Sequence, residues 1–246
     1  MKRVLVISDN PVLAEFIMSL IHTDGLCQYA TFEFRYSASN KSPSVMISLG
    51  FDSINLKDYD VVDNLICNYD LILSIHCKQI FPLKLVSCIR CINLHPGFNP
   101  YNRGWYPQVF SIINKKPIGA TLHVMTENID AGPIIAQQSV HIDSSDTSMT
   151  LYEKVRKIEF YLLKKYLKLL IDGNVEFDEC QFQGNINSLS DFKNLCKLDV
   201  DSVGTLREHI DLLRALTHGE FQNAFFIDDS GVKVYIKLHF ISEDAK

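Results

Sequence analysis

The 246-residue sequence has no apolar run long enough to cross a membrane and no excess of basic charge. Its longest apolar helical stretch, 160–171, is interrupted by Lys164, Lys165 and Lys168, whereas a membrane helix needs about 18 consecutive apolar residues. The net charge of −5 provides no overall attraction for nucleic-acid phosphates or for an anionic membrane surface. We therefore expect a soluble protein that binds neither nucleic acid nor a membrane.

A secretion signal and a cysteine framework are also missing. The apolar segment Val4–Ile7 ends at Ser8, far short of the roughly 7–15 apolar residues of a signal peptide. Seven cysteines, an odd number, are dispersed along the chain and predict reduced, mostly buried thiols. Cys88 and Cys91 form an isolated C-x-x-C without a second ligand pair, so we expect no metal site. These features predict a cytoplasmic protein.

Three common catalytic motifs are absent: the Walker A sequence, G-x-G-x-x-G and G-x-S-x-G. Their absence argues against an NTPase, a dinucleotide-dependent oxidoreductase and an α/β-hydrolase. The chain is instead 47% apolar, with strand-like and helix-like segments in alternation. Strand patterns cover 3–7, 29–36, 70–75, 91–94, 118–125 and 134–142, and helical periodicity covers 12–20, 106–113 and 149–171. This alternation predicts an α/β fold with a Rossmann-like, largely parallel sheet.

The last third of the chain differs from the rest in the length and polarity of its segments. After Gly173 the segments are shorter and more polar, with a helix predicted over 205–216. The apolar runs Ala224–Ile227 and Val232–Leu238 flank a turn that ends at Gly231, a pattern typical of a β-hairpin. We predict a catalytic domain over 1–175 and a small α+β appendage over 176–246.

The first strand delivers a polar loop to the start of a helix. Ser8, Asp9 and Asn10 supply oxygens that can cap the helix, and Pro11 suits its first turn. A helix N-terminus can also bind an anion such as a phosphate. Both readings stay open, an ordinary cap or a nucleotide contact.

Asn93, His95 and Asp130 are the candidate catalytic residues. Asn93 and His95 end a strand two residues apart, so both side chains leave the same face of the sheet. An amide donor beside an imidazole can stabilise a carbonyl oxygen that becomes negative and can move a proton. Asp130, on a turn, can orient the imidazole. Taken singly, each residue is equally compatible with a turn or capping role.

Together these residues form a specific pattern. Asn93-Leu-His-Pro-Gly97, followed by Asp130-Ala-Gly132, resembles the N10-formyltetrahydrofolate-dependent formyltransferase family. The segment Asn99-Pro-Tyr-Asn-Arg-Gly-Trp-Tyr106 is similar to that of the branch that formylates amino sugars linked to dTDP, in particular dTDP-4-amino-4,6-dideoxyglucose. The resemblance covers residues 1–175 well, and Arg214-Ala-Leu-Thr-His-Gly219 extends it into the appendage.

The resemblance implies a reaction. The sugar amine attacks the formyl carbon of the co-substrate N10-formyltetrahydrofolate, Asn93 and a protonated His95 meet the oxyanion, and His95 or a water held by Asp130 takes the amine proton. Implied folate contacts lie in two segments: Ile75, His76, Cys77 and Lys78, and Glu127, Asn128 and Ile129. Implied contacts to the nucleotide-linked amino sugar are Asp9, Asn10, Asn102, Arg103, Trp105 and Tyr106.

The chemistry of two of these residues suits such a substrate. Arg103 can bind a diphosphate in bidentate fashion, and Trp105 can stack on a base or pack on a sugar, although a lone Trp is as often a core anchor. The resemblance further implies a homodimer built by the C-terminal region and a product used in surface polysaccharide such as O-antigen.

Several other activities remain open from the sequence. They are methionyl-tRNA formyltransferase, glycinamide ribonucleotide formyltransferase, a formyltransferase for UDP-amino sugars, formyltetrahydrofolate hydrolase and a non-catalytic sugar-nucleotide-binding protein. The acidic net charge and the lack of a basic appended domain argue against tRNA.

Overall fold

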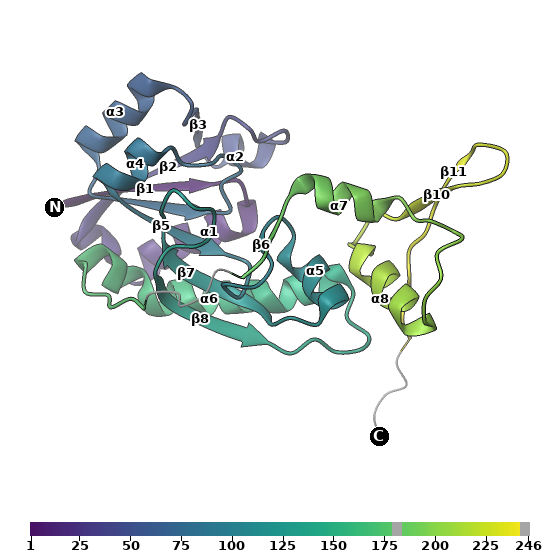
Figure 1. Cartoon of the computed structure of the whole chain (residues 1–246). Helices are drawn as coiled ribbons and strands as arrows, with labels where there is room; N and C mark the ends of the chain where they lie inside the picture. The colour runs from purple at the N-terminus through teal and green to yellow at the C-terminus, as the bar shows by residue number, and fades with distance from the viewer. Residues whose placement is uncertain (179–183, 242–246) are drawn as a thin grey trace.

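A seven-stranded sheet is the centre of the computed structural model, which describes residues 1–178 and 184–241 (Figure 1). The strand order is β3-β2-β1-β4-β5-β7-β8; β1 to β5 run parallel, and β7 and β8 are antiparallel to their neighbours. The strands are β1 Lys2–Ser8, β2 Ala30–Ser37, β3 Asp52–Ile54, β4 Leu71–Ile75, β5 Arg90–His95, β7 Ile118–Val124 and β8 Ile134–Val140. The predicted largely parallel α/β sheet is confirmed.

Helices cover both faces of the sheet, which explains why its central strands are largely apolar. The helices are α1 Pro11–Thr23, α2 Ser44–Ser48, α3 Tyr59–Asn68, α4 Leu83–Cys88, α5 Pro107–Asn114 and α6 Ser148–Asp172, with a 3₁₀ turn at Leu26–Gln28. One core cluster packs α1, α5 and α6 against the sheet, and another packs α3 and α4 against the opposite face. Strand β4 is consequently buried along its whole length.

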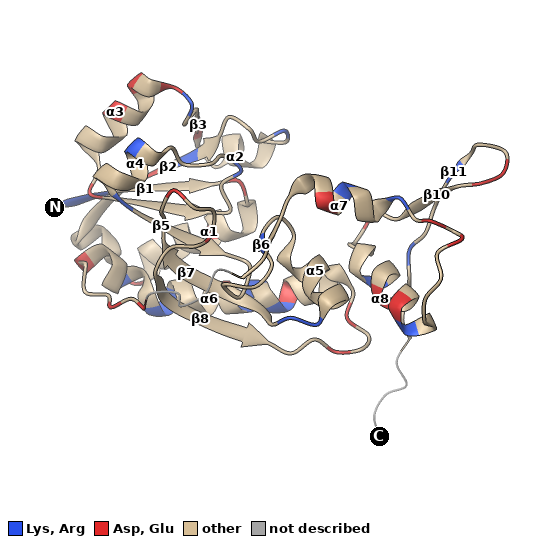
Figure 2. Cartoon of the chain, in the orientation of Figure 1, with Lys and Arg blue, Asp and Glu red and all other residues tan. Residues whose placement is uncertain are grey.

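The longest helix, α6, has well-defined ends. Thr147 and Thr150 form a reciprocal capping box at its start, and Gly173 ends it in the left-handed conformation with φ of 84°. No helix in the described part of the chain is both long and apolar enough to cross a membrane. Lys and Arg segments are interspersed with Asp and Glu segments along the ribbon (Figure 2).

The C-terminal part contains two helices and two small sheets. Its elements are β9 Ile186–Asn187, α7 Leu189–Cys196, α8 Leu206–Leu216, β10 Phe225–Ile227 and β11 Lys233–Tyr235. The antiparallel pair β10·β11 confirms the predicted hairpin. Strand β9 pairs in parallel with β6, Arg103–Gly104, so the chain returns to the sheet domain before entering α7 (Figure 1).

Several elements were not predicted from the sequence. Helix α7 carries a Ser188 and Asp191 capping box, but its polar composition resembles a loop. Helix α3, with an Asp58 cap, buries only Val62 and Leu65, and the 3₁₀ turn, α2, β3, β6 and β9 are too short for a periodic pattern. A short piece expected over 178–182 lies mostly outside the described residues.

Candidate active site

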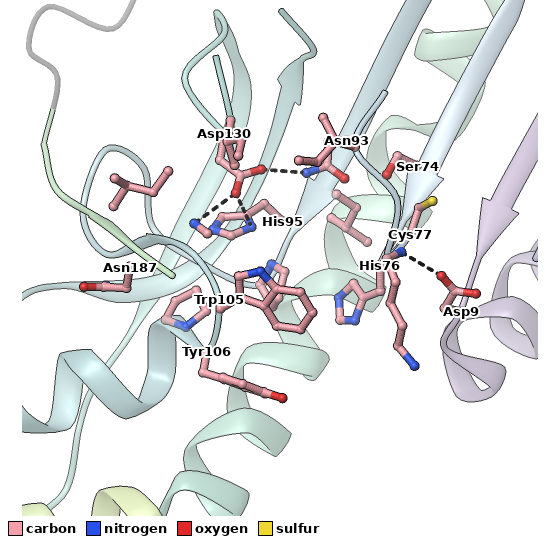
Figure 3. A pocket seen from close by; sticks show the side chains of 18 of the residues that line it. Asp9, Ser74, His76, Cys77, Asn93, His95, Trp105, Tyr106, Asp130 and Asn187 are labelled. Atoms are coloured by element: carbon pink, nitrogen blue, oxygen red, sulfur yellow. Dashed lines mark hydrogen bonds and ion pairs between the residues drawn. The ribbon is translucent and has the colours of Figure 1, made fainter. Parts of the chain in front are cut away.

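Asn93 and His95 project from the carboxyl end of β5 toward Asp130 (Figure 3). The Asn93 amide nitrogen donates to Oδ1 of Asp130 at 3.0 Å, and Nδ1 of His95 lies 3.4 Å from Oδ2. The alternation of a β-strand places both side chains on one face, as the sequence predicted. Asp130 reaches them from the turn that precedes β8. The three predicted catalytic residues are therefore in mutual contact.

The Asp130 carboxylate is held by more partners than the sequence suggested. The Gly104 backbone N–H donates to its Oδ2 at 3.1 Å, and Nε2 of His123 lies 3.4 Å from its Oδ1. Burial by itself raises the pKa of Asp130, but the two facing imidazoles and the Gly104 N–H outweigh it and hold that pKa below its usual range. Asp130 is thus a carboxylate at neutral pH.

His95 is neutral in this environment. Burial is the largest influence and lowers the pKa of His95 from 6.5 to about 4, although the Asp130 carboxylate acts in the opposite direction. With Nδ1–H directed at Asp130, Nε2 is left as an acceptor, and Nε2 is buried without a hydrogen-bond partner. The unpartnered nitrogen is a group that can accept a proton.

We expect His95 to stay neutral from pH 8 down to about pH 5, because its pKa in the folded protein is about 4. The unfolded chain protonates this side chain near pH 6.5, so its contribution to stability falls as the pH drops from 6.5 toward 4. NMR titration of the imidazole resonances, with His95 assigned by comparison with His95→Ala, measures this directly. A midpoint near 6.5 for His95 contradicts the expected neutral state.

The catalytic face opens on a cavity of about 880 Å³. Its lining comes from the ends of β4 and β5, the loop before α5 and the turn around Asp130. The C-terminal region adds Asp191 and Phe192 of α7 and residues within 218–223. Ligand pockets are commonly of this size. Within residues 1–178 and 184–241, no group of three or more His, Cys, Asp or Glu side chains is placed to hold a metal ion.

Most of the predicted folate contacts line this cavity. They are His76, Cys77, Lys78, Glu127, Asn128 and Ile129. Ile75 does not: it is 1% exposed and belongs to the core between the sheet and α1. Lys78 is the single Lys or Arg among the described lining residues.

Four of the six predicted sugar-nucleotide contacts also line the cavity: Asp9, Asn10, Trp105 and Tyr106. Asn10 caps α1, accepting from the N–H groups of Val12 and Leu13, as the capping reading predicted. The Asp9 carboxylate connects three segments of the protein, since it accepts hydrogen bonds from Ser37 and from the backbone N–H of Lys78 at 2.7 Å.

Asn102 and Arg103 are outside the described lining of this cavity. Asn102 is fully buried, and its amide nitrogen donates to Ser111 Oγ at 2.9 Å. Arg103 donates from Nη1 to the Ile129 carbonyl at 3.2 Å. Asn102 has a left-handed backbone, with φ of 48°, and its side chain hydrogen-bonds to groups of α5 rather than lining the cavity.

A contact between a histidine and a buried glutamate, which the sequence did not predict, lies at the cavity wall. His76, with φ of 58° at the end of β4, places Nε2 at 2.5 Å from Oε1 of Glu159 on α6. Glu159 is 0% exposed, and His76 and Tyr152 line the cavity in front of it. Tyr152 and Glu159 are seven residues apart on α6, a spacing that places them on one helix face. This spacing is the signal in the sequence that could have pointed to Glu159.

Removing His76 should destabilise the protein strongly. The variant His76→Ala leaves the fully buried Glu159 side chain without the one hydrogen-bond partner that the described residues give it. Leaving a buried polar group without its partner costs about 1–3 kcal/mol, and we expect the free energy of unfolding at pH 7 to fall by about that amount. Urea unfolding measures it. The control is His76→Ala/Glu159→Leu, which should recover part of the loss; equal stability of the single variant and wild type refutes the prediction.

Comparisons with known proteins agree with this geometry. The profile of the formyl transferase family matches residues 28–167, and a profile described as the N-formyltransferase dimerization C-terminal domain matches residues 191–243. The dTDP-4-amino-4,6-dideoxyglucose formyltransferase of Mycobacterium bovis is 45% identical over 177 residues, which span 72% of this chain and 76% of that protein.

Solved structures extend the similarity over nearly the whole chain. A sugar N-formyltransferase from a Shewanella species is 51% identical with a TM-score of 0.95, covering 98% of this chain and 100% of that one. A 4-N formyltransferase from Francisella tularensis is 41% identical with a TM-score of 0.90, covering 98% and 99%. Since the family profile alone spans more than half of the sequence, the chain belongs to the formyl transferase family and is a formyltransferase.

Proposed function

We propose that this enzyme transfers the formyl group of N10-formyltetrahydrofolate to the 4-amino group of dTDP-4-amino-4,6-dideoxyglucose. The observation that carries the proposal is the contact of Asn93, His95 and Asp130 at the cavity, because this set supplies a proton acceptor and an oxyanion donor at one point. The substrate follows from similarity to the mycobacterial enzyme of that name.

The proton acceptor in this proposal is Nε2 of His95. The amine nitrogen attacks the formyl carbon, the resulting tetrahedral intermediate loses a proton from nitrogen to Nε2, and the bond to N10 breaks as N10 gains a proton. Asp130 favours the imidazolium that forms, since its carboxylate faces Nδ1. The geometry supports this assignment, because Nε2 is buried and has no hydrogen-bond partner among the described residues.

Asn93 is assigned to the oxyanion. One N–H of its amide faces Asp130, and the amide nitrogen lies 3.2 Å from Nε2 of His123, whose Nδ1 contacts the Val124 carbonyl. We assign the second N–H of this amide, the one that does not face Asp130, to the oxyanion of the intermediate. Each such donor is typically worth about 10²–10³ in kcat.

We place the two reactants in adjoining parts of the cavity, which meet where the Asn10 amide nitrogen lies 3.3 Å from Nδ1 of His76. The folate lies beside Glu127–Ile129 and the segment His76–Lys78, and the sugar nucleotide lies toward Asn10, Trp105 and Tyr106. Trp105 is 40% exposed and lies over the cavity, so its ring is available for stacking (Figure 3).

The decisive experiment is incubation of the protein with N10-formyltetrahydrofolate and dTDP-4-amino-4,6-dideoxyglucose, followed by mass spectrometry. The expected product is the sugar nucleotide with one added carbonyl. Parallel reactions contain the UDP-linked amino sugar, glycinamide ribonucleotide or methionyl-tRNA. Formylation of one of these instead, or release of formate alone, overturns the proposed substrate.

The remaining assignments concern organisation and location. We place the boundary of the catalytic domain near residue 175, just after α6 ends. We assign the product of the reaction to surface polysaccharide such as O-antigen. We propose a cytoplasmic location, supported by the six described cysteines, which are free thiols as expected in a reducing compartment.

A homodimer formed through the C-terminal region is also proposed. The dimerization-domain profile over 191–243 supports it, as do large apolar side chains that are exposed there, including Leu206 and Val232. We expect light scattering at micromolar concentration to give twice the mass of the 28.1 kDa chain. Leu206→Lys on α8 tests this surface, and a monomeric mass for wild type refutes the prediction.

A further inference from the structure

The start of the C-terminal region is clamped against the loop that follows the catalytic strand. The Arg103 N–H donates to the Asn185 carbonyl at 3.0 Å, and the Trp105 N–H donates to the Asn187 carbonyl at 2.9 Å. Between them, Gly104 has φ of 85°, and a Cβ there would lie 2.5 Å from the Asn187 carbonyl oxygen. We call the pair β6·β9, residues 103–104 and 186–187 with Asn185, the clip.

Asn102 ties this clip to helix α5. Its side-chain oxygen Oδ1 accepts from Nδ2 of Asn185 at 2.7 Å and from Nδ2 of Asn114 at 2.7 Å, and its backbone N–H donates to Oδ1 of Asn185 at 3.1 Å. Its own Nδ2 donates to Ser111 at 2.9 Å. A fully buried amide with this many partners fixes the relative positions of three segments, since each unmade hydrogen bond is costly.

The clip in turn holds the catalytic aspartate. Gly104 donates its N–H to Oδ2 of Asp130 at 3.1 Å, the same oxygen that faces His95. The Arg103 guanidinium donates to the backbone carbonyl of Ile129, which directly precedes Asp130. Asp130 has φ of 48°, a left-handed conformation that is uncommon for a non-glycine residue, although Asp adopts it more often than most.

We propose that Asn102 and Asn185 are positioning residues for catalysis: through the clip they set the location of the Asp130 carboxylate, and through it the orientation of His95. The C-terminal region thereby becomes part of the catalytic apparatus. Of the two measurements that test this inference, only turnover rests on the proposed function. The state of His95 can be observed by NMR without turnover.

The expected consequence is a loss of rate without a matching loss of binding. Neither Asn102 nor Asn185 is among the lining residues of the cavity. A displacement of a catalytic group by about 1 Å can cost about 100-fold in rate. We expect Asn185→Ala to lower kcat by about 10- to 100-fold while KM for both substrates changes by less than about threefold.

The experiment combines kinetics with NMR of the full chain. The variants are Asn185→Ala, Asn102→Ala and the double variant, and the matched control is Asn68→Ala on the remote helix α3. If both residues act through the clip, the double variant should lose little more than the more damaging single variant. The His95 ¹⁵N resonances should shift in the clip variants, because the Nδ1–H no longer faces a fixed carboxylate. Asn68→Ala should leave kcat and these resonances unchanged.

The outcomes separate this inference from the proposed function. If wild type formylates a different amine, that substrate is used for the kinetics and the inference stands or falls unchanged. If Asn102→Ala does not fold, the half-buried Asn185 still tests the clip. The inference is wrong if Asn185→Ala keeps kcat within twofold of wild type, or if its His95 resonances coincide with those of wild type.

Discussion

His95→Ala should lower kcat by about 10²–10⁴-fold, the usual contribution of a positioned acid–base group. In the folded protein, Nε2 of His95 is an acceptor without another partner, and the Asp130 carboxylate faces the opposite nitrogen. Removal of the ring deletes both the acceptor and the group on which Asp130 acts. Initial rates of formyl transfer, followed by mass spectrometry of the sugar nucleotide, measure the effect.

The controls for His95→Ala address folding and competing bases. The circular dichroism spectrum should match that of wild type, because the imidazole lines the cavity and is absent from the apolar core clusters. His123→Ala is the matched comparison: it removes a second imidazole beside Asp130 but leaves Nε2 of His95 in place, and its loss should be smaller. Unchanged turnover in His95→Ala rules out the proposed base.

Gly97→Ala should have the second largest effect, about 100-fold in kcat. A Cβ at residue 97 would lie 2.3 Å from Nε2 and 2.6 Å from Cδ2 of His95, which is closer than real atoms approach. The methyl group would also meet Pro107 at 3.2 Å, so it has little freedom to move away. The imidazole must therefore rotate out of its position, and misplacement by about 1 Å costs on this scale.

The same assay and a structure of the variant test the Gly97 prediction. We expect KM for the folate to change less than kcat, since the altered contact is with the catalytic ring rather than with the lining at Glu127–Ile129. Gly204→Ala provides a control at an exposed glycine without a left-handed backbone, where the added carbon would meet only the side-chain ends of Glu208 and His209, both at 3.2 Å. A fully active Gly97→Ala shows that the ring does not need its present position.

The sequence could predict those parts of the site that depend on local geometry. Asn93 and His95 share a strand, so a period of two places them together without knowledge of the rest of the fold. Asp130 comes from a separate turn, and only the resemblance to a family connects it with them. Asn10 as a cap also follows from local rules.

Other parts depend on contacts that no local pattern encodes. His76 and Glu159 are 83 residues apart and meet because α6 packs beneath the end of β4. Arg103 was expected to bind a diphosphate because of its charge and its neighbours; it lies outside the described lining of the cavity, and its Nη1 donates to the Ile129 carbonyl at 3.2 Å. Helix α7 was not predicted because it has little apolar surface to bury: Cys196 is its single buried residue.

The scarcity of positive charge in the cavity affects how substrates arrive. Lys78 is the single Lys or Arg among the described lining residues, and the whole chain carries a net charge of −5. A nucleoside diphosphate sugar and a folate are both anions, so each approaches against the mean field of the protein rather than with it. Added salt screens this repulsion over a distance of about 8–10 Å. Encounter with both substrates is then limited by repulsion at low ionic strength, and binding depends on stacking and hydrogen bonds once the substrate has entered.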